Sequence, residues 1–183
     1  DPDAPFHWRH DRALSGYNIM QMGIWYESAM RWLGPATSVI ALARVNVPAR
    51  KDDDGILRWI TIPDHVEILC EMASGPLMHM RLSTVTGLAP DDAIWFFGTQ
   101  GTLRLDSKNM VLYGGKRGQD SLDEINIPSE KQGDWRVEEE FIHAIRGRES
   151  ITHTNFDDGV KYMEFTEAVT RSVQSGKKIH LPL

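Results

Sequence analysis

Apolar residues return every three or four positions in three segments of the chain, and this spacing is typical of helices that bury one face. The first segment spans residues 18–33, where Trp25, Ala29 and Leu33 fall four apart before a Gly-Pro pair ends it. The other two span residues 134–146 and 157–175, and each is followed directly by a glycine. The apolar stripes predicted for these two helices are Val137, Phe141, Ala144 and Ile145 in the first, and Tyr162, Phe165, Val169 and Val173 in the second.

Most of the remaining apolar residues form short runs or alternate with polar ones, which indicates strands. Residues 1–17 have neither pattern and are expected to be an extended or looped entry. The predicted strands are 37–47, a hairpin over 65–85, and short strands at 93–98, 102–105, 110–113, 125–127 and 177–181. The run at 93–98 is continuously apolar and is expected to be covered on both faces. Antiparallel hairpins followed by helices predict an α+β class, a large open and mainly antiparallel sheet with helices on one face.

The hairpin also has a predicted pairing. Alternation places Val66, Ile68, Cys70 and Met72 on one face of its first strand, and Met78, Met80 and Leu82 on one face of its second. A three-residue loop over 74–76 would pair Cys70 with Met80 and set Glu71 opposite His79. Cys70 is then expected to be a buried small apolar residue rather than a nucleophile.

Composition narrows the class of protein. The chain has 183 residues, 41% of them apolar, enough for a single domain with a real core. Its net charge of −6 argues against a general nucleic-acid binder. The one cysteine suits a reducing, cytoplasmic compartment, and no segment reads as a membrane span or a signal peptide. The sequence begins at Asp1 rather than at a methionine, so we expect it to be part of a longer chain.

Familiar catalytic motifs are absent from the sequence. His7 and His10 stand three apart, but a metal pair needs a third ligand, and we expect surface histidines and no metal there. Glu138 to Glu140 are expected to form a solvated helix face, and the glycine-rich segment 114–118 a hairpin tip. No pair of acids stands out as a general acid and base.

The unusual stretch runs from Arg9 to Trp32. An amide, an aromatic ring and arginines together are a suitable lining for a polyhydroxylated or acidic small molecule. Gln21 and Trp25 fall four apart on the predicted helix and can face one pocket. The predicted substrate-binding residues are Arg9, Arg12, Asn18, Gln21 and Trp25. The alternative is that Trp25 and Trp32 are core aromatics and that the arginines form salt bridges.

The order of several segments resembles a known family. FHWRHDRALSG, NIMQMGIWYESAMRWLG, FFGTQGTLRLD, EEFIHAIRGRES and EFTEAVTRSVQSGKKIHLP together resemble the C-terminal domain of the Gfo/Idh/MocA oxidoreductases, over roughly residues 6–183. The resemblance implies a substrate-binding domain with a dihydrodipicolinate-reductase-like sheet. It also implies a separate N-terminal Rossmann domain, absent from this chain, that binds NAD or NADP and carries the family's lysine.

One departure from the family bears on catalysis. The family commonly has an acid and a histidine in a D-x-G-x-H pattern; its glycine matches Gly23, so the acid position is Gln21 and the histidine position Trp25. Neither side chain exchanges a proton near neutral pH. Glu27, Tyr26, His10 and His153 are open candidates for that role, and none is assigned as catalytic.

Two functions from different classes follow. In the first, the chain is the substrate-binding domain of an NAD(P)-dependent oxidoreductase that acts on a sugar, a polyol or a related hydroxy compound, inactive by itself. In the second, it is a non-catalytic binding or assembly module that kept the fold and lost the acid–histidine pair. A free-standing ligand-binding domain is a third possibility. The resemblance also implies a homo-oligomer formed through the sheet face that bears Leu69, His79, Arg81 and Val85.

Overall fold

A computed structural model describes residues 3–17, 19–152 and 155–183. They divide into two compact units, the first made of Asp1–Thr86 with Glu140–Leu183 and the second of Gly87–Glu139. Each unit is described by itself.

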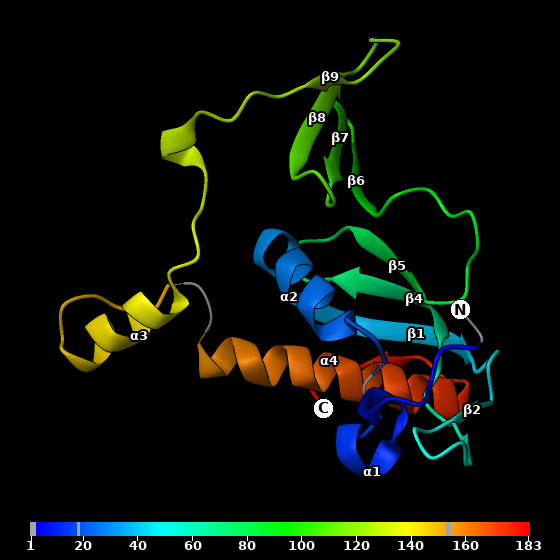
Figure 1. The fold of residues 1–183 in the computed structure, drawn as a ribbon. Helices are drawn as coiled ribbons and strands as arrows, with labels where there is room; N and C mark the ends of the chain where they lie inside the picture. The colour runs from blue at the N-terminus through cyan, green and yellow to red at the C-terminus, as the bar shows by residue number, and fades with distance from the viewer. Residues whose placement is uncertain (1–2, 18, 153–154) are drawn as a thin grey trace. The chain divides into compact units, whose positions relative to one another are not determined.

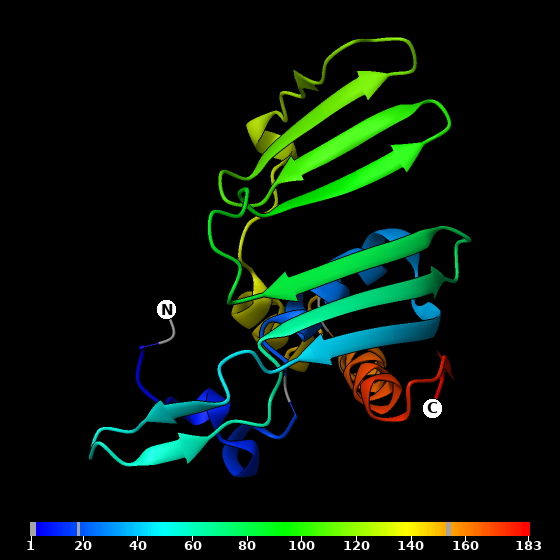
Figure 2. The same cartoon turned by 90° about the vertical axis from the view of Figure 1, so that its right-hand side faces the viewer.

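The first unit is built on a four-stranded antiparallel sheet in the order β10-β1-β4-β5. Figure 2 shows β1, β4 and β5 side by side. The strands are β1 (Ala36–Arg44), β4 (His65–Met72), β5 (Leu77–Ser83) and β10 (Ile179–His180). A separate hairpin pairs β2 (Ala49–Lys51) with β3 (Leu57–Trp59). The helices are η1 (Trp8–His10), α1 (Arg12–Ser15), α2 (Met22–Leu33), α3 (Val137–Ile145) and α4 (Phe156–Ser175).

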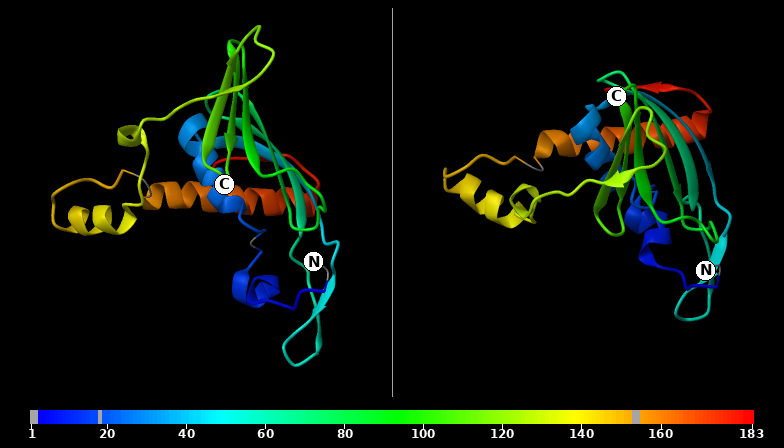
Figure 3. Two further views of the ribbon diagram at one scale, coloured as in Figure 1. Left: turned by 45° about the horizontal axis from the view of Figure 1, so that its top comes forward. Right: turned by 90° about the horizontal axis from the view of Figure 1, so that it is seen from above.

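Helices α2 and α4 cover one face of this sheet, and α2 crosses α4 (Figures 1 and 3). At the crossing the Tyr26 ring stacks on Phe165, with centroids 3.6 Å apart and planes 2° from parallel. Val66, Ile68 and Cys70 of β4 point into the same core. Burial raises the pKa of the Cys70 thiol to about 12, as expected of a buried apolar residue. The predicted α+β class, with helices on one sheet face, is confirmed.

The two long helices end as their sequences predict. Gly34 ends α2 at φ 71° and Gly176 ends α4 at φ 68°, the left-handed region that favours glycine. The Asn155 side chain accepts a hydrogen bond from the Asp158 amide and begins α4. Helix α2 begins at Met22, later than predicted, because Met20 has φ 49° and interrupts the helix.

The buried face of α2 differs from the predicted stripe. Met22, Tyr26, Ala29 and Met30 are buried, whereas Trp25 and Leu33 are half-buried. The reason is the crossing with α4, which turns the Tyr26 side of the helix toward the core. The predicted stripe of α4 is correct, since Phe165 and Val169 are buried and Tyr162 and Val173 pack against the same core.

A buried serine ties α4 to the sheet. Ser172 Oγ accepts a hydrogen bond from the Ala41 amide at 2.9 Å and donates one to the Lys177 carbonyl at 2.7 Å. Its side chain is fully buried. The hydroxyl therefore satisfies a strand amide and a carbonyl that follows the helix, both shielded from water.

Replacing this serine is expected to destabilise the protein. Ser172→Ala leaves the Ala41 amide without its partner, which costs about 1–3 kcal/mol of unfolding free energy. Urea denaturation followed by circular dichroism measures the change. Ser175→Ala is the matched control, because the exposed Ser175 hydroxyl donates to the Arg171 carbonyl at 2.7 Å and accepts from the Lys177 amide at 3.3 Å, where water can replace it. Equal effects of the two substitutions would contradict the structural role of Ser172.

The hairpin of β4 and β5 has the predicted faces but a different pairing. Cys70 lies opposite Met78 rather than Met80, and Leu69 rather than Glu71 lies opposite His79. The cause is the loop, because the amides of Ala73 and Ser74 donate to the carbonyls of Pro35 and Leu33 at the end of α2. The Met72 amide donates to the Pro76 carbonyl, so the turn is centred on Ser74, one residue earlier than predicted. The pairing therefore shifts by two, which keeps every side chain on its face.

The second unit is a meander of four antiparallel strands in the order β6-β7-β8-β9. The strands are β6 (Ala93–Gly98), β7 (Gly101–Asp106), β8 (Val111–Lys116) and β9 (Asp123–Glu124), followed by η2 (Ser129–Lys131). The strand expected at 125–127 lies instead at 123–124, and β8 extends into the segment expected to be a hairpin tip. β6 is not covered on both faces, because Trp95 and Phe97 are exposed on one of them.

Helix α3 also departs from its predicted burial. Val137, Phe141 and Ile145 are exposed, whereas Glu140, expected to be solvated, is buried. The Glu140 carboxylate accepts hydrogen bonds from the Thr152 amide at 3.2 Å and from the Thr152 hydroxyl at 2.6 Å. Glu140 is therefore buried because it pairs with the chain that follows the helix, a contact that the spacing of apolar residues in α3 does not encode.

Candidate functional site

The entry segment is folded rather than extended, and its histidines act as caps. His7 Nδ1 accepts from the Arg9 amide at 3.3 Å, and His10 Nδ1 accepts from the His7 amide at 3.0 Å. Burial lowers the pKa of His10, and the nearby charges of Arg50 and His7 lower it further. His10 is therefore neutral at pH 7, with Nδ1 occupied as an acceptor and its proton on Nε2. The prediction that His7 and His10 lie in extended chain is therefore wrong, because they flank and end a short 3₁₀ helix.

The entry segment is anchored on the β2–β3 hairpin. The Phe6 amide donates to the Lys51 carbonyl at 2.8 Å, and the Arg50 guanidinium donates to the Ala4 carbonyl at 2.7 Å. Asp11 then begins α1 by accepting from the Ala13 amide. These contacts fix the two short helices that carry the predicted arginines.

The structure places the predicted site residues on three neighbouring elements. Arg9, in η1, lies with its guanidinium 4.4 Å from the Trp8 ring centroid, and Arg12, in α1, lies 5.3 Å from that of Tyr17. Both arginines therefore lie against aromatic rings, and neither forms the salt bridge of the alternative interpretation with any residue that the structure describes. Asn18 lies outside the described residues.

Gln21 and Trp25 lie together at the start of α2. Gln21 is the N-cap residue, its side chain is exposed, and it makes no capping hydrogen bond. The Trp25 amide donates to the Gln21 carbonyl at 3.2 Å, so the two residues occupy successive turns. The Gln21 amide is thus available to a ligand beside the half-buried Trp25 ring. The structure gives no direct contact between this pair and the arginines.

Two of the open candidates for proton transfer have other roles. Tyr26 is fully buried, and its hydroxyl oxygen accepts from the Ala36 amide at 2.8 Å; burial raises its pKa. It is a core residue and not a proton donor to substrate. Glu27 pairs with Arg31 at 2.7 Å on the helix surface. His153 lies outside the described residues, so His10 is the candidate whose chemistry the structure defines.

The sheet face opposite the helices is apolar and open in the first unit. This open face carries the exposed side chains of Ile40, Leu42, Leu69 and Leu77. Glu67 lies beside them, with its carboxylate 2.7 Å from His79 Nε2 and 3.3 Å from Arg81 Nε. Exposed apolar area of this kind is typical of an interaction surface.

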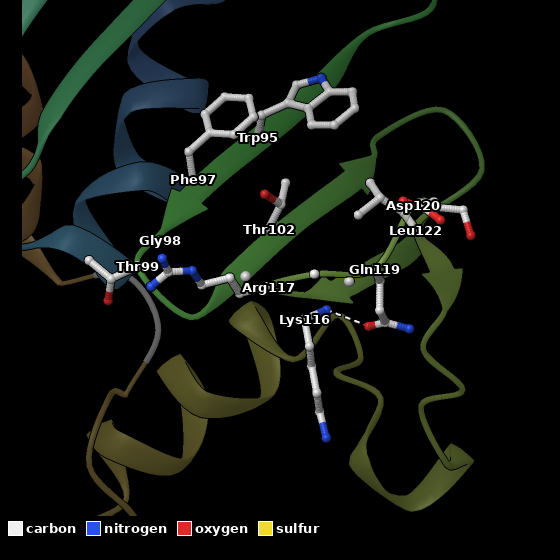
Figure 4. A pocket seen from close by; sticks show the side chains of 14 residues that line it. Trp95, Phe97, Gly98, Thr99, Thr102, Lys116, Arg117, Gln119, Asp120 and Leu122 are labelled. Atoms are coloured by element: carbon white, nitrogen blue, oxygen red, sulfur yellow. Dashed lines mark hydrogen bonds between the residues drawn. The ribbon is translucent and has the colours of Figure 1, made fainter.

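A shallow hollow of about 600 Å³ lies in the second unit, over β6, β7 and the end of β8 (Figure 4). Trp95 and Phe97 form one side, and the chain after β8 forms the other. The sequence analysis missed this feature, since the continuous apolar run at 93–98 indicated a strand buried on both faces. The sequence has no alternation there that could have located it, since Trp95, Phe96 and Phe97 are consecutive aromatic residues.

A sequence model described as the GFO/IDH/MocA C-terminal domain matches residues 1–104, more than half of the chain. The chain belongs to the Gfo/Idh/MocA family. The matched part includes every predicted substrate-binding residue and both strands of the β4–β5 hairpin. No curated protein sequence matches the chain.

Solved structures similar to this Gfo/Idh/MocA domain have the same fold. An NAD binding oxidoreductase from Klebsiella pneumoniae aligns with a TM-score of 0.82 at 19% identity, covering 100% of this chain and 56% of that one. The apo form of levoglucosan dehydrogenase aligns at 0.83 with 17% identity, again covering 100% and 56%. The WlbA dehydrogenase from Bordetella pertussis, in complex with NADH and UDP-GlcNAcA, aligns at 0.60 with 20% identity, covering 89% and 44%. This chain therefore spans about half the length of these structures.

The described residues do not fit a dinucleotide. Such a site needs a glycine-rich loop between a parallel strand and a helix N-terminus that holds the pyrophosphate. Here the N-cap residues of α2 and α4 are Gln21 and Asn155, neither helix is preceded by such a loop, and the sheets are antiparallel. Over residues 3–17, 19–152 and 155–183, no group of three or more His, Cys, Asp or Glu side chains is arranged to hold a metal. No helix in the same ranges is long and apolar enough to cross a membrane.

Proposed function

We propose that this chain is the substrate-binding domain of an NAD(P)-dependent oxidoreductase that acts on a sugar, a polyol or a related hydroxy compound. The observation that carries the proposal is the family match over residues 1–104 together with an exposed Gln21 amide and Trp25 at the start of α2. Relatives of the same fold include levoglucosan dehydrogenase in complex with NADH and levoglucosan. The nicotinamide cofactor would be held mainly by a separate Rossmann domain, and the protein would be cytoplasmic.

In this proposal the substrate lies against the N-terminal end of α2. Gln21 orients hydroxyl groups, Trp25 gives an apolar wall, and Arg9 and Arg12 hold a carboxylate or hydroxyls from η1 and α1. Asn18 belongs to the same proposed set. NAD or NADP, when bound, takes up or supplies the hydride, while these residues bind and orient the substrate.

Proton transfer in this chain would differ from the family pattern. Gln21 and Trp25 occupy the acid and histidine positions, and neither titrates near pH 7. A neutral His10 with its proton on Nε2 can donate a hydrogen bond to a substrate oxygen, but it has no free acceptor nitrogen. We assign no catalytic residue on this basis.

The substrate site is tested by alanine substitution in the full-length protein. The triple variant of Arg12, Gln21 and Trp25 removes a charged and a neutral hydrogen-bonding group, so we expect KM for levoglucosan or myo-inositol to rise roughly 10-fold or more. NADH formation from NAD⁺ measures it. Arg171→Ala is the control, because this arginine forms an ion pair with Glu167 on the exposed surface of α4. An unchanged KM in the triple variant would overturn the site assignment.

The second candidate function is a non-catalytic binding or assembly module. The observation that favours it is the pair of non-titrating residues at the acid and histidine positions. Turnover of levoglucosan or myo-inositol by the full-length protein with NAD⁺ or NADP⁺ would eliminate this candidate. Both candidates include a homo-oligomer formed through the open face.

A further inference from the structure

Two aromatic rings form a flat, exposed platform on the second unit. Trp95 and Phe97 are two residues apart on β6 and so share a face. Their ring planes are 8° from parallel and their centroids 5.8 Å apart. Trp95 is 47% exposed and Phe97 79% exposed. We propose that this platform and the hollow beside it bind a neutral saccharide chain, at a site separate from the substrate residues of the first unit.

The Trp95 ring of the platform is held in place by side chains of the neighbouring strands. Trp95, Arg104 and Tyr113 lie opposite one another across β6, β7 and β8. The Arg104 guanidinium is 5.6 Å from the Trp95 ring centroid and 5.4 Å from that of Tyr113. A cation held between two rings restrains the indole, so the platform is formed before any ligand arrives.

The hollow has room beside Thr102 because the neighbouring position in β8 is a glycine, Gly115, and carries no side chain. Phe97 lies opposite Thr102, which lies opposite Gly115. A Cβ at Gly115 would come within 2.9 Å of both Leu122 Cδ2 and the Ser121 carbonyl oxygen. Glycine therefore lets the chain after β8 close against the strand and form the far wall of the hollow.

Polar side chains without protein partners surround this apolar floor. Thr102 lies in the middle of the hollow, Arg117 runs along one end and Asp120 stands on the far wall (Figure 4). In the described part of the chain, the side chains of Arg117 and Asp120 make no hydrogen bond or ion pair. The rim thus offers donors at one end and a carboxylate acceptor at the other.

This combination favours a saccharide over other ligands. A pyranose ring has an apolar C–H face for one aromatic surface and hydroxyl groups at its edge that both donate and accept. The platform is open on one side, which suits a ligand whose other face stays in water. Asp120 offsets one of the two positive charges that Lys116 and Arg117 bring to the lining, which weakens the attraction of the hollow for phosphate and other anions. Two nearly parallel exposed rings suit consecutive sugars of an extended chain. The volume is within the about 300–1,000 Å³ of small-molecule sites.

Titration of the 183-residue chain with cellotriose, followed by ¹H–¹⁵N NMR, tests the proposal. We expect the Trp95 indole N–H and the amides of Gly98 and Gly115 to shift together. The double variant W95A/F97A is expected to weaken binding at least 10-fold, whereas Trp59→Ala, which removes an exposed tryptophan of β3, leaves it unchanged. Asp120→Asn and Arg117→Gln keep the platform, and each is expected to weaken binding several-fold if the double variant fails to fold.

Three results would overturn the proposal. The first is that cellotriose shifts no NMR signal, and the second is that W95A/F97A, Asp120→Asn and Arg117→Gln all bind cellotriose as tightly as the wild type. The third is that W95A/F97A changes the sedimentation coefficient while the protein shows no response to cellotriose. The last result would assign the platform to contact between two copies of the chain. Since the residues tested lie in the second unit, none of these outcomes bears on the substrate site proposed for the first unit.

Discussion

Replacing Phe165 with alanine is expected to produce the largest loss of stability in this domain, about 3–5 kcal/mol of unfolding free energy. Phe165 is fully buried at the crossing of α2 and α4, where its ring stacks on Tyr26 at 3.6 Å. The substitution opens a cavity in the core where both helices pack against the sheet. Urea denaturation monitored by far-UV circular dichroism measures the change.

A phenylalanine on the same helix gives the matched control. Phe156 begins α4 and is 92% exposed, so Phe156→Ala is expected to change the unfolding free energy by about 0.5 kcal/mol or less. Comparable losses from the two substitutions would mean that the crossing of α2 and α4 does not hold the core together. The position of the proposed substrate residues on α2 would then lack its structural basis.

Placing a carboxylate on the open face is expected to abolish self-association. Leu69 is 55% exposed at the centre of this face, opposite Ile40 on β1 and His79 on β5. If the face pairs with a second copy, Leu69→Asp buries an unpaired charge that costs several kcal/mol and raises the dimer Kd roughly 100-fold or more. Sedimentation velocity over a range of concentrations measures it.

The control for this substitution is Leu14→Asp, which alters a more exposed leucine that lies in α1 and not in the sheet. It is expected to leave the sedimentation coefficient unchanged. A wild-type protein that stays monomeric at high concentration would contradict the proposed oligomer. So would a Leu69→Asp variant that associates as tightly as the wild type.

Local patterns correctly predicted the presence of the three longest helices, the buried stripe of α4 and the faces of the β4–β5 hairpin. The 3.6-residue period of Phe165 and Val169 and the glycine stops at 34 and 176 are properties of adjacent residues. The faces of the β4–β5 hairpin were predictable although its pairing was not, because a pairing shift of two leaves the faces unchanged.

Contacts between distant segments account for the errors. The loop amides of Ala73 and Ser74 bind the end of α2, and this contact decides the hairpin pairing. Glu140 is buried because Thr152 satisfies it, although the run of three glutamates indicated a solvated surface. Neither contact leaves a periodic signal in the sequence.

The candidate site was predictable only in part. The residue types at Gln21 and Trp25 and the family resemblance located the start of α2, and the structure places both residues there. The roles of His7 and His10 as caps depend on a short 3₁₀ helix that the pattern did not predict. The aromatic platform escaped notice because a continuous apolar run does not reveal which of its faces is exposed.

The central claim is that this chain is the C-terminal half of an NAD(P)-dependent oxidoreductase. Determining the coding sequence upstream of Asp1, over about 100–150 codons, tests it most directly. The account predicts a strand, a G-x-G-x-x-G loop and a helix there, followed by the family's lysine. A start codon beside Asp1 would contradict it, because no cofactor domain would precede the substrate-binding domain.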